Sequence, residues 1–156
     1  MRGPKLKMGA MVRGPTPSNI LLVEDDPNDV ELTRRALQRA KLQNRLWIVT
    51  DGEQALAFLR REGQHRGVPR PDLLLLDLRL PLLDGRDVLL RIREEPRWRR
   101  LSVIVLTASD AEQEQLATLA ADGFLTKPVD FARLEEAIRG IAGLGWAIVK
   151  TAAAEA

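Results

Sequence analysis

The sequence predicts an α/β domain in which helices cover both faces of a parallel sheet. Five short apolar segments alternate with five segments of helical periodicity, which is the order typical of parallel strands joined by right-handed crossovers. The most apolar segment, 73–77, has four leucines in a row before Asp77. An unbroken run of this kind is typical of a strand buried on both faces. We therefore expect segment 73–77 at the centre of the sheet.

Length and composition agree with one globular domain. The 156 residues are enough for one full core and leave little room for a second. Apolar content of 45% and charged content of 29% are ordinary for such a domain. No apolar run approaches the roughly 20 residues that span a bilayer, so we expect no membrane partner. The absence of cysteine excludes disulfides and fits a cytoplasmic location.

The net charge of +2 is unevenly distributed. Residues 1–18 contain four basic residues, no acidic residue, three glycines and three prolines, so the rest of the chain carries −2. We interpret 1–18 as a disordered basic tail; an arm that binds nucleic acid or membrane is the less favoured alternative. The nearly balanced remainder gives no reason to expect a nucleic-acid partner. The expected organisation is a tail (1–18), a folded domain (19–144) and a C-terminal extension (145–156).

The other strands are expected at 19–23, 45–49, 101–106 and 123–126. Helix starts follow each strand and are marked by capping residues and Pro27. The expected caps are Asp26 before Pro27, Thr50 with Glu53, Asp84, Ser109 with Glu112, and Asp130. The helix after Ser109 is expected to run to about residue 121.

Polar residues stand where four of the five strands end. They are Glu24 and Asp25, Asp77, Thr107 and Lys127. The carboxyl ends of parallel strands meet at one edge of a sheet, where ligands bind in open α/β folds. The strand 45–49 has no such residue and is expected at the margin of the sheet. The sequence thus brings three acids, one hydroxyl and one lysine to one edge.

Three clustered carboxylates require a cation. Two carboxylates 4 Å apart repel by roughly 4 kcal/mol at an effective dielectric near 20. Oxygen ligands without His or Cys favour a hard divalent ion, and we expect Mg²⁺, with Mn²⁺ or Ca²⁺ as substitutes. Lys127 and Thr107 suit phosphate oxygens. Such a site can stabilise phosphoryl transfer to a carboxylate, and Asp77 on the central strand is the best nucleophile candidate.

Four stretches together resemble the receiver domains of two-component response regulators. They are Ile-Leu-Leu-Val-Glu-Asp-Asp at 20–26, Leu-Asp-Leu-Arg-Leu-Pro-Leu-Leu-Asp-Gly at 76–85, Val-Leu-Thr-Ala at 105–108 and Phe-Leu-Thr-Lys-Pro at 124–128. The resemblance covers about 19–141. It implies a flavodoxin-like (βα)5 fold with a five-stranded sheet of order 2-1-3-4-5.

The resemblance also implies roles for individual residues. Asp77 would be the phosphoacceptor, supplied by the phosphohistidine of a histidine kinase. Asp25, Asp77 and the carbonyl of Arg79 would bind Mg²⁺ directly, and Glu24 would act through water.

Thr107 and Lys127 would contact the phosphoryl group. Phe124 resembles the family's switch aromatic, which swings inward when Thr107 moves; a plain core aromatic is the alternative. The Lys127–Pro128 bond is expected to be cis.

A finer resemblance is to the stand-alone regulators encoded with bacterial phytochromes. It is carried by Val-Glu-Asp-Asp-Pro-Asn-Asp-Val-Glu-Leu at 23–32, Asp-Gly-Glu-Gln-Ala-Leu-Ala-Phe-Leu-Arg-Arg-Glu-Gly at 51–63 and the polar loop at 63–70. It implies a phytochrome kinase as partner. It also implies a homodimer through the fourth helix, fifth strand and fifth helix, which the chain after Ile141 would strengthen.

The expected function is signalling by a single-domain response regulator and not catalysis on other substrates. About 15 residues follow Ile141, so output is expected through protein contacts: binding a target, passing phosphate onward or draining it from a kinase. A receiver-shaped adaptor that needs no phosphate is the alternative. A phosphohydrolase ranks last, because Arg79 stands where such enzymes usually have a second Asp.

Several other residues have a structural and a functional interpretation. We expect Asp26 and Asp84 to be helix caps and not metal ligands, and His65 to be a surface residue. For the basic cluster around Trp98 we expect a solvated helix end, with a docking patch as the alternative; the cluster is Arg91, Arg93, Arg97, Arg99 and Arg100. Trp146 either caps the core or lies on a dimer surface.

Overall fold

The computed structural model describes residues 18–39, 44–109 and 120–141. Its strands are β2 (Ser18–Val23), β3 (Asn44–Val49), β4 (Leu73–Asp77), β5 (Ser102–Thr107) and β6 (Gly123–Thr126). Its helices are α2 (Pro27–Arg39), α3 (Gly52–Arg60), the short 3-10 turn η2 (Gly63–His65), α4 (Gly85–Glu94) and α6 (Phe131–Arg139).

The five strands form one parallel sheet in the order β3-β2-β4-β5-β6. Counted along the chain this is 2-1-3-4-5, so the predicted flavodoxin-like topology is confirmed. Strand β4 lies at the centre, and all five of its residues are buried. Strand β3 lies at the margin, also as predicted.

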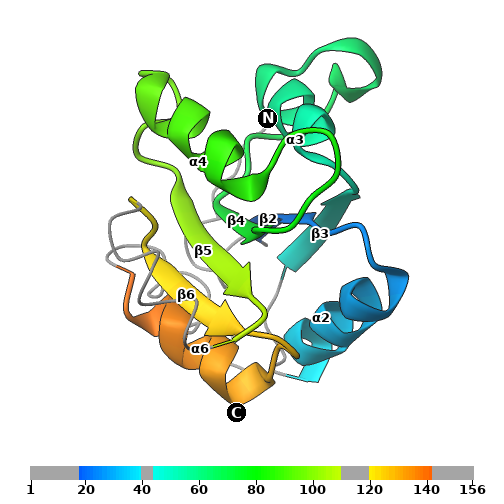
Figure 1. Cartoon of the computed structure of the whole chain (residues 1–156), viewed down its shortest axis with the longest axis vertical. Helices are drawn as coiled ribbons and strands as arrows, with labels where there is room; N and C mark the ends of the chain where they lie inside the picture. The colour runs from blue at the N-terminus through cyan, green and yellow to red at the C-terminus, as the bar shows by residue number, and fades with distance from the viewer. Residues whose placement is uncertain (1–17, 40–43, 110–119, 142–156) are drawn as a thin grey trace, which may run out of the picture.

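The run of leucines in β4 is explained by a layer of helices on each face of the sheet. Helices α3 and α4 lie on one side of the sheet, and α2 and α6 on the other (Figure 1). Successive strand residues point to opposite faces. Leu74 and Leu76 therefore pack in the core under α3 and α4, while Leu73 and Leu75 pack in the core under α2 and α6.

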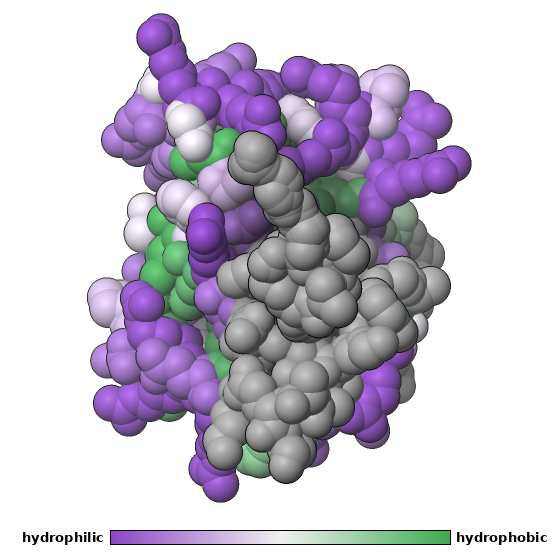
Figure 2. All heavy atoms as spheres, turned by 180° about the vertical axis from the view of Figure 1, so that it is seen from behind, coloured by the Kyte–Doolittle hydropathy of each residue, from purple (hydrophilic) through white to green (hydrophobic). Residues whose placement is uncertain are grey.

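The surface of the described part is dominated by polar side chains. Among the coloured residues in Figure 2, hydrophilic side chains predominate, and hydrophobic ones form smaller patches between them. Three large hydrophobic residues are exposed among the described ones, namely Leu32, Leu82 and Leu90. No helix within 18–39, 44–109 or 120–141 is both long enough and apolar enough to cross a membrane.

Three predicted helix caps are confirmed, and one is wrong. The carboxylates of Asp26, Asp84 and Asp130 accept hydrogen bonds from backbone N–H groups in the first turns of α2, α4 and α6. At α3 the cap is Asp51 and not Thr50: the Asp51 carboxylate accepts from Gln54 N at 2.7 Å. Because α3 begins at Gly52, Asp51 occupies the position that the first free N–H groups face.

Some predictions fall on residues outside the described ranges. They include most of the predicted helix 109–121, almost all of the tail at 1–18 and the extension with Trp146. Ala120 and Ala121, which are described, are not helical. Ser18 belongs to β2, so this strand begins one residue earlier than expected.

His65 is buried and not on the surface, so that prediction is wrong. Only 9% of the residue is exposed. Its ring lies 5.3 Å from the Phe58 ring, and its Nε2 lies 2.8 Å from Gln54 Oε1. The turn Gly63–His65 folds back on α3, and this contact between neighbouring elements buries a side chain in an otherwise polar segment.

The basic cluster around Trp98 is only partly solvated. Trp98 is buried, and the guanidinium groups of Arg60 and Arg97 lie 5.9 Å and 5.0 Å from its ring centroid. Arg91 is exposed as predicted, but Arg93 is not part of a solvated face.

Arg93 joins α4 to the starts of β5 and β6. Its Nη1 donates to the carbonyls of Arg99 (2.9 Å) and Leu101 (2.7 Å), and its Nε donates to Ala120 O (2.7 Å). Its Nη2 lies 3.1 Å from Asp122 Oδ2, which also accepts the backbone N–H of Val103. We call this set the Arg93 junction.

Candidate functional site

The register of the sheet places the predicted polar residues side by side. Val23 is paired with Leu76, so Glu24 follows beside Asp77. Asp77 is paired with Leu106, and Thr107 is the next residue on β5. Thr107 is in turn paired with Thr126, which precedes Lys127. The common edge predicted from the strand ends therefore exists.

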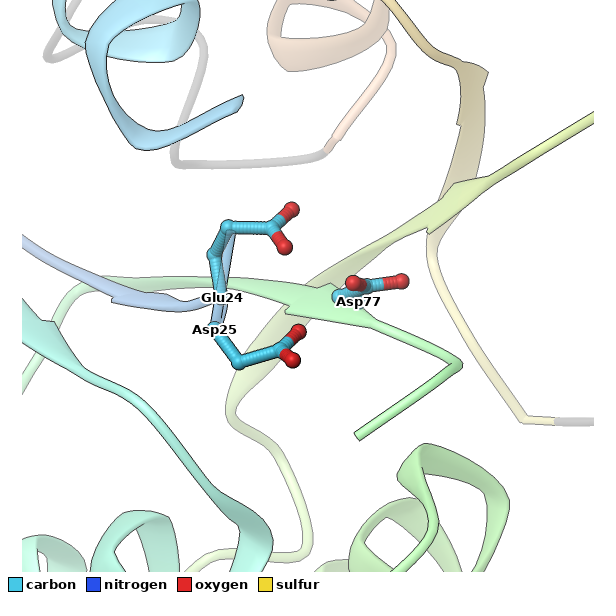
Figure 3. A group of neighbouring side chains, drawn as sticks. All are labelled: Glu24, Asp25 and Asp77. Carbon is cyan, nitrogen blue, oxygen red and sulfur yellow. The ribbon is translucent and has the colours of Figure 1, made fainter. Parts of the chain in front are cut away.

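Three carboxylates meet at this edge. One oxygen each of Glu24, Asp25 and Asp77 lies within 4.8 Å of the others. In Figure 3 the side chains of Glu24 and Asp25 leave the end of β2 on the side where Asp77 ends β4. Glu24 is fully buried and Asp77 is 4% exposed, whereas Asp25 is exposed.

Lys127 is the cation that faces these acids. Its Nζ donates to Glu24 Oε1 at 2.8 Å, to Asp77 Oδ2 at 3.0 Å and to Asp29 Oδ2 at 3.0 Å. Asp29, an acid in the first turn of α2, was not predicted to belong to this site. Its position in the sequence could have indicated this contact. The first turn of a helix that directly follows a strand lies beside the carboxyl edge of the sheet, so an acid in that turn can reach the site.

The Asp77 carboxylate is oriented from two sides. Oδ2 accepts from Lys127, and Oδ1 accepts from the backbone N–H of Arg79 at 3.1 Å. The Arg79 side chain is exposed. The loop after β4 thus holds one oxygen of Asp77, and the lysine after β6 holds the other.

Thr107 ends β5, and Phe124 lies on the adjacent strand β6. Thr107 is buried, and its hydroxyl donates to the Ser109 carbonyl at 3.2 Å. Phe124 is half-buried and packs against the core under α3 and α4. The Lys127–Pro128 bond is cis, as predicted.

The electrostatics of the site reflect burial together with crowded acids. Burial raises the pKa of Glu24 from 4.5 to about 7, and the adjacent Asp77 adds to this, although the hydrogen bond from Lys127 acts in the opposite direction. Burial lowers the pKa of Lys127, but its hydrogen bonds to Glu24, Asp77 and Asp29 outweigh burial and raise it above the usual range. Lys127 is therefore fully protonated at neutral pH.

The donor set fits a hard divalent cation. Glu24, Asp25, Asp29 and Asp77 outnumber the single lysine, so the site has an excess of negative charge. Carboxylate and carbonyl oxygens are the ligands that Mg²⁺, Mn²⁺ and Ca²⁺ prefer. Asp26 and Asp84 are not in the cluster of possible metal ligands found among the described residues, in agreement with their roles as caps.

Comparisons with known proteins identify the family. The response regulator receiver domain model matches residues 20–139. Response regulator Rcp1 of Synechocystis sp. is 40% identical over 127 residues, which cover 80% of this chain and 86% of Rcp1. Among solved structures, the bacteriophytochrome response regulator AtBRR is similar (TM-score 0.79, 38% identity, 86% of this chain and 98% of that one). So is the Mn²⁺-bound form of Rcp1 (TM-score 0.67, 39% identity, 84% and 95%). This chain belongs to the response regulator receiver domain family.

Proposed function

We propose that Asp77 accepts a phosphoryl group from the phosphohistidine of a histidine kinase, in a reaction that requires Mg²⁺. The observation that carries this proposal is the contact of Lys127 Nζ with Asp77 Oδ2 at 3.0 Å, next to carboxylates of Glu24 and Asp25. A nucleophile, metal-binding acids and an amine for phosphate oxygens thus lie together. Receiver domains as a family act in signalling with histidine kinases and bind divalent metal ions.

In the proposed transfer, an Asp77 carboxylate oxygen attacks the phosphorus atom. A new O–P bond forms, the P–N bond of the phosphohistidine breaks, and the imidazole leaves with the electron pair and takes a proton from solvent. The Arg79 N–H holds the other carboxylate oxygen, which fixes the direction of attack. Lys127 neutralises charge on the phosphoryl oxygens, and Thr107 supplies a hydroxyl donor.

The metal would be held by side chains and one carbonyl of this chain. Asp25 and Asp77 would ligate Mg²⁺ directly, the Arg79 carbonyl would be a third ligand, and Glu24 would act through water. When bound, the ion neutralises charge on the transferred phosphoryl oxygens. The Mn²⁺-bound form of Rcp1 supports this assignment and suggests Mn²⁺ as a substitute.

The signal would leave through protein contacts. Thr107 would move toward the phosphoryl group, and Phe124 would turn inward with it. The partner surface would include β6 and α6, on which we propose a homodimer. A phytochrome kinase is proposed as the phosphodonor, because AtBRR and RcpA, which share 38% and 37% identity with this chain, are named as a bacteriophytochrome and a cyanobacterial phytochrome response regulator.

Labelling with a small phosphodonor tests the proposal. The full chain is incubated with acetyl phosphate and Mg²⁺, and the Asp77→Asn variant and the Asp87→Asn variant are treated in parallel. Asp87 is an exposed acid on α4 and serves as the matched control. We expect a hydroxylamine-labile label on the wild type and on Asp87→Asn, and none on Asp77→Asn or in EDTA. An unlabelled wild type would favour the phosphate-independent adaptor.

A further inference from the structure

Leu82 has a strained backbone and an exposed side chain. Its φ is +68°, and the N–H of Leu83 donates to the carbonyl of Pro81 at 2.7 Å. This bond between residues i and i+2, around a residue of positive φ, defines a γ-turn of the rare strained kind. Glycine adopts such backbone angles readily, whereas leucine does not. At 81% exposure, Leu82 is the most exposed large hydrophobic residue in the described part of the chain.

The turn is held in place from both of its ends. Gly85 N donates to Leu78 O at 2.9 Å, and a Cβ at Gly85 would lie 2.4 Å from Asp77 O, so the loop returns closely to the end of β4. A Cβ at Gly52 would lie 2.3 Å from Leu83 O, so the loop also packs closely against the start of α3. These contacts fix the backbone around Leu82, as a strained conformation requires.

The folded domain buries little of the Leu82 side chain. The neighbouring Leu83 packs against the core, whereas Leu82 points to solvent. An exposed leucine forfeits the free energy of burial, and its positive φ adds a cost that glycine would avoid. Leu82 lies five positions after the nucleophile candidate and is both strained and exposed. Such a residue points to a contact with another molecule, because it does not stabilise the folded domain itself.

We infer that Leu82 is an apolar contact for the kinase surface that surrounds the phosphohistidine, and that it helps to select the kinase. This inference rests on the proposed function. The imidazole must reach Asp77, so the donor protein must lie across the loop 78–84 that begins and ends beside Asp77. A donor surface with an apolar recess at this place would bury Leu82 on docking. A small phosphodonor makes no such contact.

The test compares two donors that both break a P–N bond. One is phosphoramidate, and the other is a purified bacterial phytochrome histidine kinase that has been autophosphorylated with ATP. The full chain is used as wild type and as Leu82→Gly, Leu82→Asn and Leu82→Met. Leu90→Ala, at an exposed leucine of α4, is the matched control.

For Leu82→Gly and Leu82→Asn we expect kcat/KM for phosphotransfer from the kinase to be about tenfold lower than for the wild type. This factor corresponds to losing the burial of about half of the leucine side-chain surface on docking. Their rates with phosphoramidate should equal that of the wild type. Leu82→Met keeps an apolar contact and should stay within about twofold of the wild type with both donors, as should Leu90→Ala.

The outcomes separate this inference from the proposed function. Wild-type rates of Leu82→Gly and Leu82→Asn with the kinase would overturn the inference alone. So would a wild type that takes phosphate from phosphoramidate but not from the kinase. A wild type labelled by neither donor would overturn the proposed function as well. Leu82→Gly should also keep or raise the melting temperature. A fall of about 4 °C or more would contradict the claim that the Leu82 backbone is strained.

Discussion

The two ends of the sheet use clustered charged side chains in opposite ways. At the amino ends of β5 and β6, Arg93 faces three carbonyls and one carboxylate, so its charge is matched by Asp122. At the carboxyl ends, Lys127 faces Glu24, Asp29 and Asp77, and acids exceed cations. A cluster in which positive and negative charges balance holds elements together. A cluster with more acids than cations can bind a further cation. The comparison suggests that charge balance distinguishes a structural cluster from a functional one.

The largest expected effect on stability is at the Arg93 junction. Arg93→Met should lower the free energy of unfolding by about 3 to 4 kcal/mol, because four hydrogen bonds from a charged donor are lost: three carbonyls lose this donor, and Asp122 keeps only the N–H of Val103. Urea unfolding measures this loss. Arg91→Met, at an exposed arginine of the same helix, should change stability by less than about 0.5 kcal/mol. Equal effects of the two substitutions would contradict a structural role for the junction.

The acid site should make the metal-free protein sensitive to pH. Between pH 4.5 and 7 the unfolded chain loses the Glu24 proton while the folded protein retains it, because burial raises the pKa of Glu24 to about 7. The contribution of Glu24 should therefore lower stability by about 3 kcal/mol as pH rises through this window. Urea unfolding in EDTA at pH 5 and pH 7.5 should show the fall in the wild type and a smaller one in Glu24→Gln. Identical pH profiles would refute the effect.

Removing an acid that Lys127 does not bind should relieve the excess charge. Asp25→Ala should raise the metal-free free energy of unfolding by about 1 kcal/mol, because one repulsion at a mostly solvated position is removed. The same variant should no longer be labelled by acetyl phosphate. Glu62→Ala, at an exposed acid away from the site, is the control and should change neither quantity. A lower melting temperature of Asp25→Ala in EDTA would count against crowded acids.

The smallest effect is expected at Arg79. Its proposed metal ligand is the backbone carbonyl, and its side chain is exposed. Arg79→Ala should therefore leave the Mg²⁺ dissociation constant within about twofold of the wild type, as for other surface substitutions. Isothermal titration calorimetry measures this constant. A tenfold weaker affinity would show that the side chain takes part in metal binding.

The sheet and much of the site could be predicted because their signals are local. The unbroken run 73–76 indicates a strand between two helical layers, and Asp77 marks its end. Parallel strands direct their carboxyl ends to one edge, so Glu24, Asp77 and Lys127 could be grouped without any contact being known. Capping chemistry at Asp26 and Asp84 is equally local, since each cap lies within three residues of its partner.

Other features depended on which elements pack together. Asp29 meets Lys127 across 98 positions of the chain, and Arg93 meets Asp122 across 29. His65 was predicted on the surface because its neighbours in the sequence are polar, but the turn folds against Phe58. No local sequence pattern predicts such pairings, because they depend on where each helix is placed on the sheet.

The sequence by itself predicted five parallel strands, the central place of 73–77 and the edge on which acids, hydroxyl and lysine gather, because hydrophobic periodicity and strand-end residues depend on residue type and spacing. The strand order was implied by the resemblance to receiver domains. Only the tertiary structure decided that Lys127 binds three acids at once, that Arg93 is a structural junction and that Leu82 is strained. These features arise from packing between distant segments, which sets the distances between charges and the backbone angles of a loop held at both ends.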